Sequence, residues 1–174
     1  IRDFQLREGL EYGDFAVLYR TNAQSRAIEE ALRKENVPYR VIGGTSFYER
    51  KEIKDVLAYL KLLGNPNDTA SLQRVINYPT RGIGSKTQER LQRYAQEHTL
   101  SLWQAVERVE DIDTLGTRAE RAVGAFRTLI ARYASKAGTG SAAPDDLARD
   151  LIDDAGLLSE LRKEHTRENL QRWE

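Results

Sequence analysis

Near the middle of the chain, between two patterns typical of helices, lies the stretch YPTRGIGSKT, residues 78–87. Gly82 and Gly84 can adopt backbone angles that are closed to other residues, and they let the backbone of a ligand come close. Ser85 with Gln88 has the spacing of a capping box, which predicts that a helix begins at Ser85. The first amides of a helix have no internal partner and carry partial positive charge, so they suit a phosphate oxygen. The stretch therefore predicts a hairpin that binds a phosphate.

Basic side chains follow the hairpin at helical spacing. Lys86, Arg90 and Arg93 fall on roughly one face of the predicted helix, and an apolar helical pattern precedes the hairpin at residues 72–76. Together these features resemble a helix-hairpin-helix, a module that grips the DNA backbone without reading sequence. The residues expected to contact DNA are Thr80, Arg81, Gly82, Ile83, Gly84, Ser85, Lys86, Thr87 and Arg90. The alternative that stays open is a tight structural turn between packed helices.

The composition restricts how such a contact can arise. The 174 residues include 27 basic and 27 acidic side chains, so the formal net charge is zero and any contact with nucleic acid must come from a local patch. The absence of cysteine excludes disulfides and cysteine-bound metals, and it fits a reducing, cytoplasmic location. No apolar run approaches membrane-spanning length, so no membrane partner is expected. The chain opens on Ile1 and contains no methionine, from which we expect a piece of a longer protein.

A strand-helix-strand-helix order is predicted for residues 1–64. Residues 15–19 (FAVLY) and 39–42 (YRVI) are short apolar runs of strand type. Apolar residues recur at helical spacing between the two runs, and a second amphipathic helix is predicted to end near Leu63. A helical connection of this length suits a parallel pair of strands.

The rest of the chain has a different character. No strand pattern follows the breaker GNPND, residues 64–68, and we place a domain boundary there. Residues 65–174 are typical of helices throughout, with Ser101 and Gln104 as a further capping box and with Phe126 and Ile130 on the apolar face of a long helix. The predicted fold class is therefore α+β and mainly α, with a small first part, an all-helical second part and a helix-hairpin-helix-like turn in the second part.

The end of the first predicted strand offers a second candidate site. In open α/β sheets, ligands lie beyond the carboxyl ends of the strands. Tyr19 and Arg20 stand at such an end, directly before a predicted helix. Arg20 could neutralise a phosphoryl group in a transition state, and Tyr19 could stack on a flat base. The alternative that stays open is that Tyr19 packs at the edge of the sheet and that Arg20 is solvated.

No metal site is predicted. His98 and His165 have no carboxylate or second histidine at the spacing of metal ligands. The acidic side chains between Asp145 and Asp154 follow helical spacing beside an apolar face, which is typical of a solvated face. No Ser-His-Asp arrangement is supported.

Four separated segments resemble a known family. Residues 16–26 (AVLYRTNAQSR) are similar to helicase motif IV of the UvrD/PcrA/Rep group of superfamily-one DNA helicases. Residues 38–44 (PYRVIGG) and 47–55 (FYERKEIKD) resemble the segments that follow motif IV, the latter being like motif IVa. Residues 77–84 (NYPTRGIG) resemble the Gly-Ile-Gly segment with which the family's 2B subdomain contacts duplex DNA. The likeness is dense up to about residue 103 and thinner beyond it.

The resemblance implies that the two parts of the chain belong to different subdomains with different roles. Residues 1–64 would be part of the RecA-like 2A subdomain, and residues 65–174 would be most of the helical 2B subdomain. Tyr19 would stack near adenine, and Arg20 would be catalytic, reaching the γ-phosphate of ATP from across the cleft. The parent protein would be an ATP-dependent helicase that uses Mg²⁺-ATP to move 3′ to 5′ along single-stranded DNA. Its implied partners are junctions of duplex and single-stranded DNA and the remaining subdomains, 1A, 1B and the rest of 2A.

The chain also departs from the family. It lacks the Walker A sequence Gly-x-x-x-x-Gly-Lys-Thr, the Walker B acidic pair and the later motifs. We therefore expect the chain alone neither to bind ATP appreciably nor to hydrolyse it. Two other readings stay open. A motor-free, sequence-independent DNA-binding module would explain the hairpin but not Tyr19 and Arg20. In a helical protein-interaction domain, the glycine turn would be purely structural.

Overall fold

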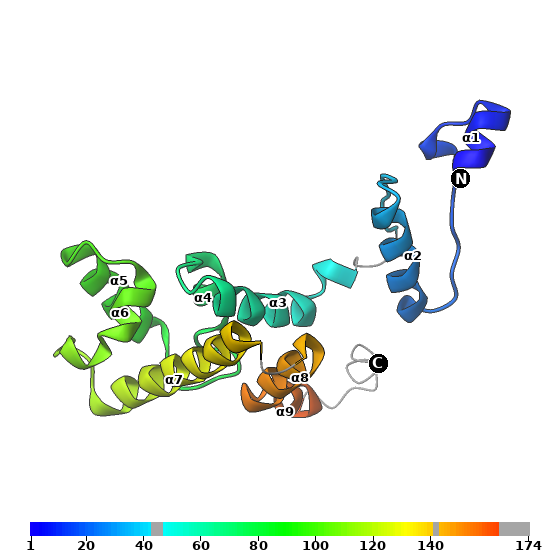
Figure 1. The fold of residues 1–174 in the computed structure, drawn as a ribbon. Helices are drawn as coiled ribbons and strands as arrows, with labels where there is room; N and C mark the ends of the chain where they lie inside the picture. Colours follow the sequence, from blue (N-terminus) through cyan, green and yellow to red (C-terminus); the bar gives the residue numbers. More distant parts are fainter. Residues whose placement is uncertain (43–46, 141–142, 164–174) are drawn as a thin grey trace. The chain divides into compact units, whose positions relative to one another are not determined.

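The structure is a computed structural model that describes residues 1–42, 47–140 and 143–163 (Figure 1). Every regular element in these ranges is a helix, which confirms the prediction of a mainly helical protein. The described residues divide into two compact units, one of residues before 55 and one from residue 55 onward. This division falls inside α3 (Lys51–Gly64) rather than after it. The assignment of subdomains to residues 1–64 and 65–174 stays a prediction.

The first unit is organised around α2 (Asn22–Lys34). Two shorter elements precede it, α1 (Arg2–Glu8) and the 3-10 turn η1 (Tyr12–Asp14), and the 3-10 turn η2 (Phe47–Glu49) follows it. A reciprocal capping box between Thr21 and Gln24 starts α2. The box satisfies donors that the first turn of a helix cannot satisfy by itself.

A buried carboxylate connects α2 to the segments that follow it. Glu29 Oε2 accepts a hydrogen bond from the Tyr39 hydroxyl at 3.0 Å, and Glu29 Oε1 accepts one from the Phe47 amide at 3.1 Å. Arg33 Nε donates to the same Tyr39 hydroxyl at 3.1 Å, and the Arg33 guanidinium lies over the Tyr48 ring at 4.2 Å. These contacts hold Tyr39 and η2 against α2.

The strands predicted at residues 15–19 and 39–42 are not confirmed. Both segments lie outside the helices, and Phe15 has extended backbone angles (φ −105°, ψ 137°), but the described residues form no β-ladder. A strand needs a neighbour to exchange main-chain hydrogen bonds with, and a ribbon of two strands is marginal in water. The side chains of Val17 and Leu18, which favoured the strand prediction, are 49% and 94% exposed.

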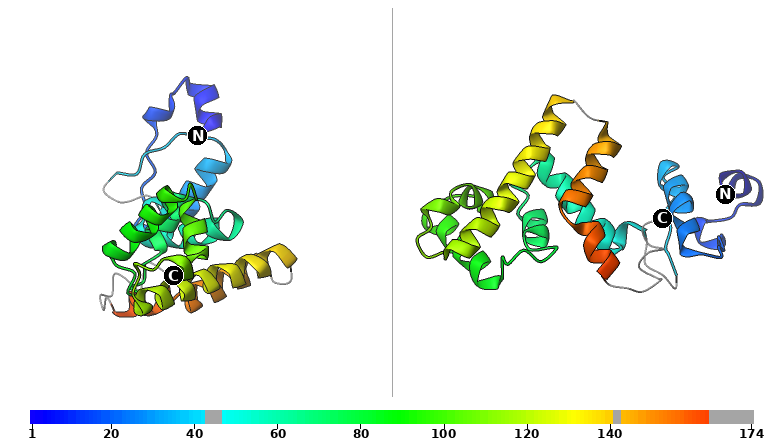
Figure 2. Two further views of the ribbon diagram at one scale, coloured as in Figure 1. Left: turned by 90° about the vertical axis from the view of Figure 1, so that its left-hand side faces the viewer. Right: turned by 90° about the horizontal axis from the view of Figure 1, so that it is seen from below.

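The second unit is a helical assembly around one apolar core. From α3 onward its helices are α4 (Thr69–Val75), α5 (Ser85–Glu97), α6 (Leu102–Glu107), η3 (Val109–Asp111), α7 (Thr117–Thr139), α8 (Pro144–Asp154) and α9 (Leu157–Lys163). In this unit α5 packs on α6, and α7 packs on both α6 and α8 (Figure 2). The apolar side chains that meet in the core include Tyr59, Leu62, Leu72, Ile83, Leu91, Val106, Phe126, Ile130 and Tyr133. The predicted apolar face of α7 is thus confirmed at Phe126 and Ile130.

The predicted helix starts have different outcomes. At α6 the capping box is confirmed, because Gln104 N donates to Ser101 Oγ at 3.1 Å and Ser101 N donates to Gln104 Oε1 at 2.8 Å. At α5 the helix begins at Ser85 as predicted, but the predicted capping box is wrong, because the cap is Gly84 and Ser85 is the first helical residue. No side chain caps this start. The amide of Thr87 donates to the carbonyl of Gly84 at 3.0 Å, which leaves the amides of Ser85 and Lys86 to other acceptors.

The described ranges contain neither a membrane-spanning helix nor a cluster of metal-binding side chains. None of the described helices combines the length and the apolar character needed to cross a bilayer. The same residues bring no three His, Asp or Glu side chains together in a way that could hold a metal ion.

Burial of Tyr59 predicts a loss of stability at alkaline pH. Desolvation, as the largest cause, raises the pKa of Tyr59 from 10.0 to about 12. The unfolded chain therefore releases this proton first, and the stabilisation is fully present below pH 10 and lost as pH rises toward 12. We expect the urea midpoint of unfolding to fall between about pH 9 and about pH 11, and to fall less in Tyr59→Phe. A Tyr59→Phe protein with the wild-type pH slope would contradict this assignment.

Candidate nucleic-acid interface

The segment between α4 and α5, residues 76–84, is held from inside by the side chain of Asn77. This segment is called the hairpin below, and its assignment to a helix-hairpin-helix stays a prediction. Asn77 Oδ1 accepts hydrogen bonds from the amides of Arg81 at 2.9 Å and Ile83 at 3.0 Å. Gln88 Nε2 donates to the carbonyl of Ile83 at 3.1 Å. The side chain of Ile83 is fully buried in the core of the second unit. Both the main chain and the side chain of Ile83 are therefore engaged within the protein.

A second set of contacts fixes the start of the hairpin. The Tyr59 hydroxyl donates to the carbonyl of Tyr78 at 2.6 Å, and Pro79 is buried. Gly82 has φ +83°, a left-handed conformation that glycine adopts without a steric penalty. The turn therefore requires glycine at position 82, as the sequence indicated. At Gly84 the backbone is extended (φ −71°, ψ 177°), so the requirement there is not one of left-handed geometry.

The outer face of the hairpin is open. Thr80, Gly82, Gly84, Ser85 and Lys86 are exposed, and Thr87 and Arg81 are partly exposed. This face includes the uncapped start of α5, where the main-chain amides carry partial positive charge. The Lys86 ammonium belongs to the same first turn. The exposed face thus combines amide donors, hydroxyls and a cation, which are the groups that bind phosphate oxygens.

The basic stripe that was predicted along α5 continues from this face. Arg90 and Arg93 are exposed. Arg90 Nη1 donates to the carbonyl of Thr114 at 2.6 Å, so this guanidinium extends toward the loop that precedes α7. The structure thus brings together the exposed candidates from Thr80 to Thr87 and places Arg90 one helical turn beyond Lys86.

The residues that shape the hairpin from the protein side were not predicted from the sequence. Asn77, Gln88 and Tyr59 make the contacts that order the turn, yet none was singled out as functional. A local signal existed for Asn77, because asparagine side chains often bind main-chain amides a few residues further on in turns. For Tyr59, 19 residues before the carbonyl that it contacts, the sequence carries no such signal.

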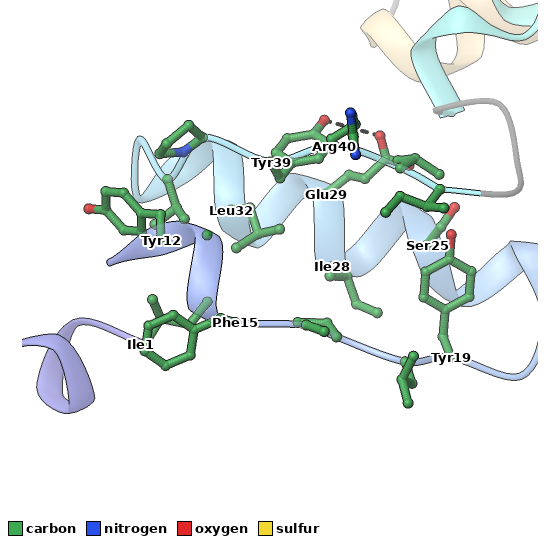
Figure 3. Close-up of a pocket in the computed structure, with 18 residues that line it drawn as sticks. Ile1, Tyr12, Phe15, Tyr19, Ser25, Ile28, Glu29, Leu32, Tyr39 and Arg40 are labelled. Atoms are coloured by element: carbon green, nitrogen blue, oxygen red, sulfur yellow. Dashed lines mark hydrogen bonds between the residues drawn. The ribbon is translucent and has the colours of Figure 1, made fainter. Parts of the chain in front are cut away.

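The second candidate site lies in the first unit. Tyr19 lines a pocket of about 750 Å³ together with side chains of α2 and of residues 37–42. Figure 3 shows Ile28 and Leu32 of α2 pointing into this pocket and Tyr19 at one end of it, next to Ser25. Arg20 is exposed and does not line the pocket, while its amide donates to Gln24 Oε1 at 2.9 Å. The ring and the guanidinium predicted to act together therefore face different surroundings.

Comparison with known proteins places the chain in a family. Residues 1–121 match the family model described as UvrD-like helicase C-terminal domain. The chain is 51% identical over 106 residues to the ATP-dependent DNA helicase PcrA of Staphylococcus epidermidis, covering 61% of the chain and 14% of that protein. It is 48% identical over 130 residues to the DNA helicase II of Haemophilus influenzae, covering 72% of the chain and 18% of that protein.

The PcrA of Staphylococcus aureus is 52% identical over 100 residues, covering 58% of the chain and 14% of that protein. The chain thus spans less than a fifth of the length of each of these relatives. The family model extends across residues 1–121, a range that contains the motif-like segments near the start of the chain and also the hairpin of the second unit. On this evidence the chain belongs to the UvrD-like helicase C-terminal domain family.

Proposed function

We propose that the chain is part of an ATP-dependent DNA helicase and that it contributes contacts to the phosphate backbone of duplex DNA. The observation that carries this proposal is the family match across residues 1–121, which includes a hairpin with an exposed, uncapped helix start. The helicase names of the relatives support the same reading. A motor-free DNA-binding module would leave the similarity around Tyr19 and Arg20 without a purpose.

The contact with the phosphate backbone of duplex DNA, called the grip below, is proposed to involve the outer face of the hairpin. The amides at the start of α5 and the exposed glycines let a phosphate come close, and the ammonium of Lys86 neutralises its charge. The hydroxyls of Thr80, Ser85 and Thr87 are further donors. Arg90 extends the positive surface along α5. Because none of these groups reads a base edge, the grip is expected to be independent of sequence.

The first unit is proposed to supply one side of an ATP site. The ring of Tyr19 offers a flat face to adenine, and the exposed Arg20 can reach a γ-phosphate presented by another part of the helicase. Mg²⁺ and the phosphate cradle would be held by the parts of the parent helicase that carry the Walker motifs. When bound, Mg²⁺-ATP would supply the energy for movement, for which we propose the 3′ to 5′ direction of the resembling family.

The pocket of the first unit is consistent with a sheet from which strands are missing. Two segments that form no ladder with any described residue, residues 15–19 and 39–42, line it together with the apolar face of α2. We propose that strands from the rest of the 2A subdomain pair with these segments in the parent helicase. Pairing would bury Val17, Leu18 and Ile42, which are 49%, 94% and 80% exposed.

The test is fluorescence anisotropy of this chain with a labelled junction of duplex and single-stranded DNA over a series of salt concentrations. Wild type is compared with a Gly82→Asp, Gly84→Asp double variant. Each phosphate contact adds about −0.9 to the slope of log affinity against log salt, so a hairpin site should give a slope of a few units. We expect the hairpin variant to lose this salt-sensitive binding, since its carboxylates repel phosphate and its Gly82 conformation is strained.

The matched control adds the same two charges elsewhere, in a Gly64→Asp, Gly138→Asp double variant. Both of these glycines are exposed, and a Cβ atom there would meet nothing within 4 Å. Circular dichroism is used to check that both variants are folded. Equal binding by wild type and the hairpin variant, or no binding by wild type at low salt, would leave the glycines as a structural turn and overturn the proposed grip.

A further inference from the structure

The guanidinium of Arg81 is directed into the protein, toward three carbonyl groups. Arg81 Nη1 donates to Pro79 O at 3.0 Å and to Val75 O at 3.3 Å. Arg81 Nη2 donates to Ala155 O at 2.7 Å. A guanidinium has two hydrogens on each Nη atom and one on Nε. Both Nη1 hydrogens and one Nη2 hydrogen are therefore used on main-chain acceptors.

Aromatic rings hold the same group from the side. The Arg81 guanidinium carbon lies 5.7 Å from the centre of the Tyr59 ring and 5.8 Å from that of the Phe126 ring. Both rings belong to the core, and arginine is stabilised over aromatic faces within about 6 Å. A side chain engaged by three acceptors and two rings is poorly placed to turn outward to a phosphate.

One of the three acceptors lies far away in the sequence. Ala155 is 74 residues from Arg81 and belongs to the turn between α8 and α9. Its neighbour Gly156 has φ +80°, and a Cβ atom on Gly156 would lie 4.0 Å from Pro79 Cγ. The α8–α9 turn therefore lies against the hairpin at two places, through the guanidinium of Arg81 and beside the ring of Pro79.

We propose that Arg81 is a positioning residue that couples the α8–α9 turn to the conformation of the hairpin, so that changes in this turn alter duplex affinity. This inference rests on the proposed grip of DNA by the hairpin. Arg81 acts through the main chain of residues 79–83 and not as a phosphate ligand. The helices α8 and α9 thereby become part of the DNA-binding machinery without touching DNA.

The first test replaces Arg81 by Lys and measures affinity for the junction DNA by anisotropy. Lysine keeps the charge but has one ammonium on a flexible stem and cannot span three carbonyls. We expect Arg81→Lys to weaken binding by about tenfold, as for the loss of one hydrogen bond from a charged donor, with the salt slope unchanged. If Arg81 binds phosphate directly, Arg81→Lys keeps most of the affinity, and this result would overturn the proposal.

The second test changes the α8–α9 turn, the part of the protein that Arg81 is proposed to couple to the hairpin. Gly156→Ala forces an alanine into a left-handed conformation beside Ala155, and Gly140→Ala is the matched control because Gly140 also has a left-handed φ, +61°, with open space at its Cβ position. Both variants carry similar backbone strain. We expect Gly156→Ala to lower duplex affinity several-fold and Gly140→Ala to leave it unchanged. In the Arg81→Lys background, Gly156→Ala should have little further effect, as coupled residues are non-additive.

A measurement without DNA tests the coupling between the α8–α9 turn and the hairpin independently of DNA binding by the hairpin. Hydrogen exchange of the Arg81 and Ile83 amides, both bound to Asn77 Oδ1, reports on the order of the hairpin. Faster exchange in Gly156→Ala than in Gly140→Ala supports the coupling even if the wild-type chain binds no DNA. Equal exchange in these two variants contradicts the coupling, whatever the DNA affinity.

Discussion

Replacement of Arg20 by alanine in the proposed full-length helicase is expected to reduce ATP turnover by about a thousandfold or more, the effect of losing an arginine that stabilises charge on a transferring phosphoryl group. The side chain of Arg20 is exposed on the first unit, so its removal leaves no cavity and should not disturb folding. Its amide contact to Gln24 is made by the main chain and survives the substitution. Affinity for single-stranded DNA should remain, because the proposed role of Arg20 concerns ATP alone.

The measurement is steady-state ATP hydrolysis with saturating single-stranded DNA, together with DNA affinity in the absence of ATP. Arg7→Ala serves as the control, because Arg7 is an exposed arginine on α1 of the same unit. An Arg20→Ala helicase with normal turnover would remove Arg20 from the catalytic residues. Loss of turnover in both variants would assign the effect to charge on this unit and not to one arginine.

Truncation of Ile83 to alanine is expected to destabilise the second unit by about 2–5 kcal/mol, the range for removing a buried aliphatic side chain. Ile83 is 0% exposed and lies in the core cluster, so the substitution leaves a cavity beneath the hairpin. The unfolding free energy is measured in urea by the fluorescence of Trp103, a core residue of the same unit, in a Trp173→Phe background. Duplex affinity should fall with it, since the hairpin loses its anchor.

The conservative Ile83→Val variant distinguishes a role of Ile83 in anchoring the hairpin to the core from a direct contact with DNA. It should cost only about 0.5–1.5 kcal/mol and should retain duplex affinity, because valine still fills most of the site. If Ile83→Ala lost duplex affinity with no loss of stability, Ile83 would be a direct DNA contact, as predicted from the sequence. A stability loss in Ile83→Ala no larger than in Ile83→Val would show that the hairpin is not anchored through this side chain.

Local patterns determined much of the second unit. The apolar face of α7 was predicted from its spacing, and Phe126 and Ile130 are buried as expected. The capping box at Ser101 was predicted correctly, because both of its hydrogen bonds join residues three apart in the sequence. The box at Ser85 was wrong because Gly84, one residue earlier, is the cap and Gln88 is bound to the carbonyl of Ile83.

The predicted strands show the opposite case. Residues 15–19 and 39–42 have the apolar composition of strands. That composition shows that these segments favour a place in a sheet. In the described part of the chain no ladder forms at either segment. A pattern of side chains predicts that a segment favours burial in a sheet, but hydrogen-bonding neighbours decide whether the strand exists.

The sequence by itself determined the helical character of the second unit, the glycine turn at residue 82 and the family to which the chain belongs, because each depends on residues close together or on a linear pattern. Only the tertiary structure decided which side chains of the hairpin face outward. Arg81 and Ile83 stand in the motif beside Gly82, yet Arg81 reaches Ala155 and Ile83 enters the core. These directions depend on contacts with α3, α7 and the α8–α9 turn, which lie far away in sequence and are brought together only by burial of the shared core.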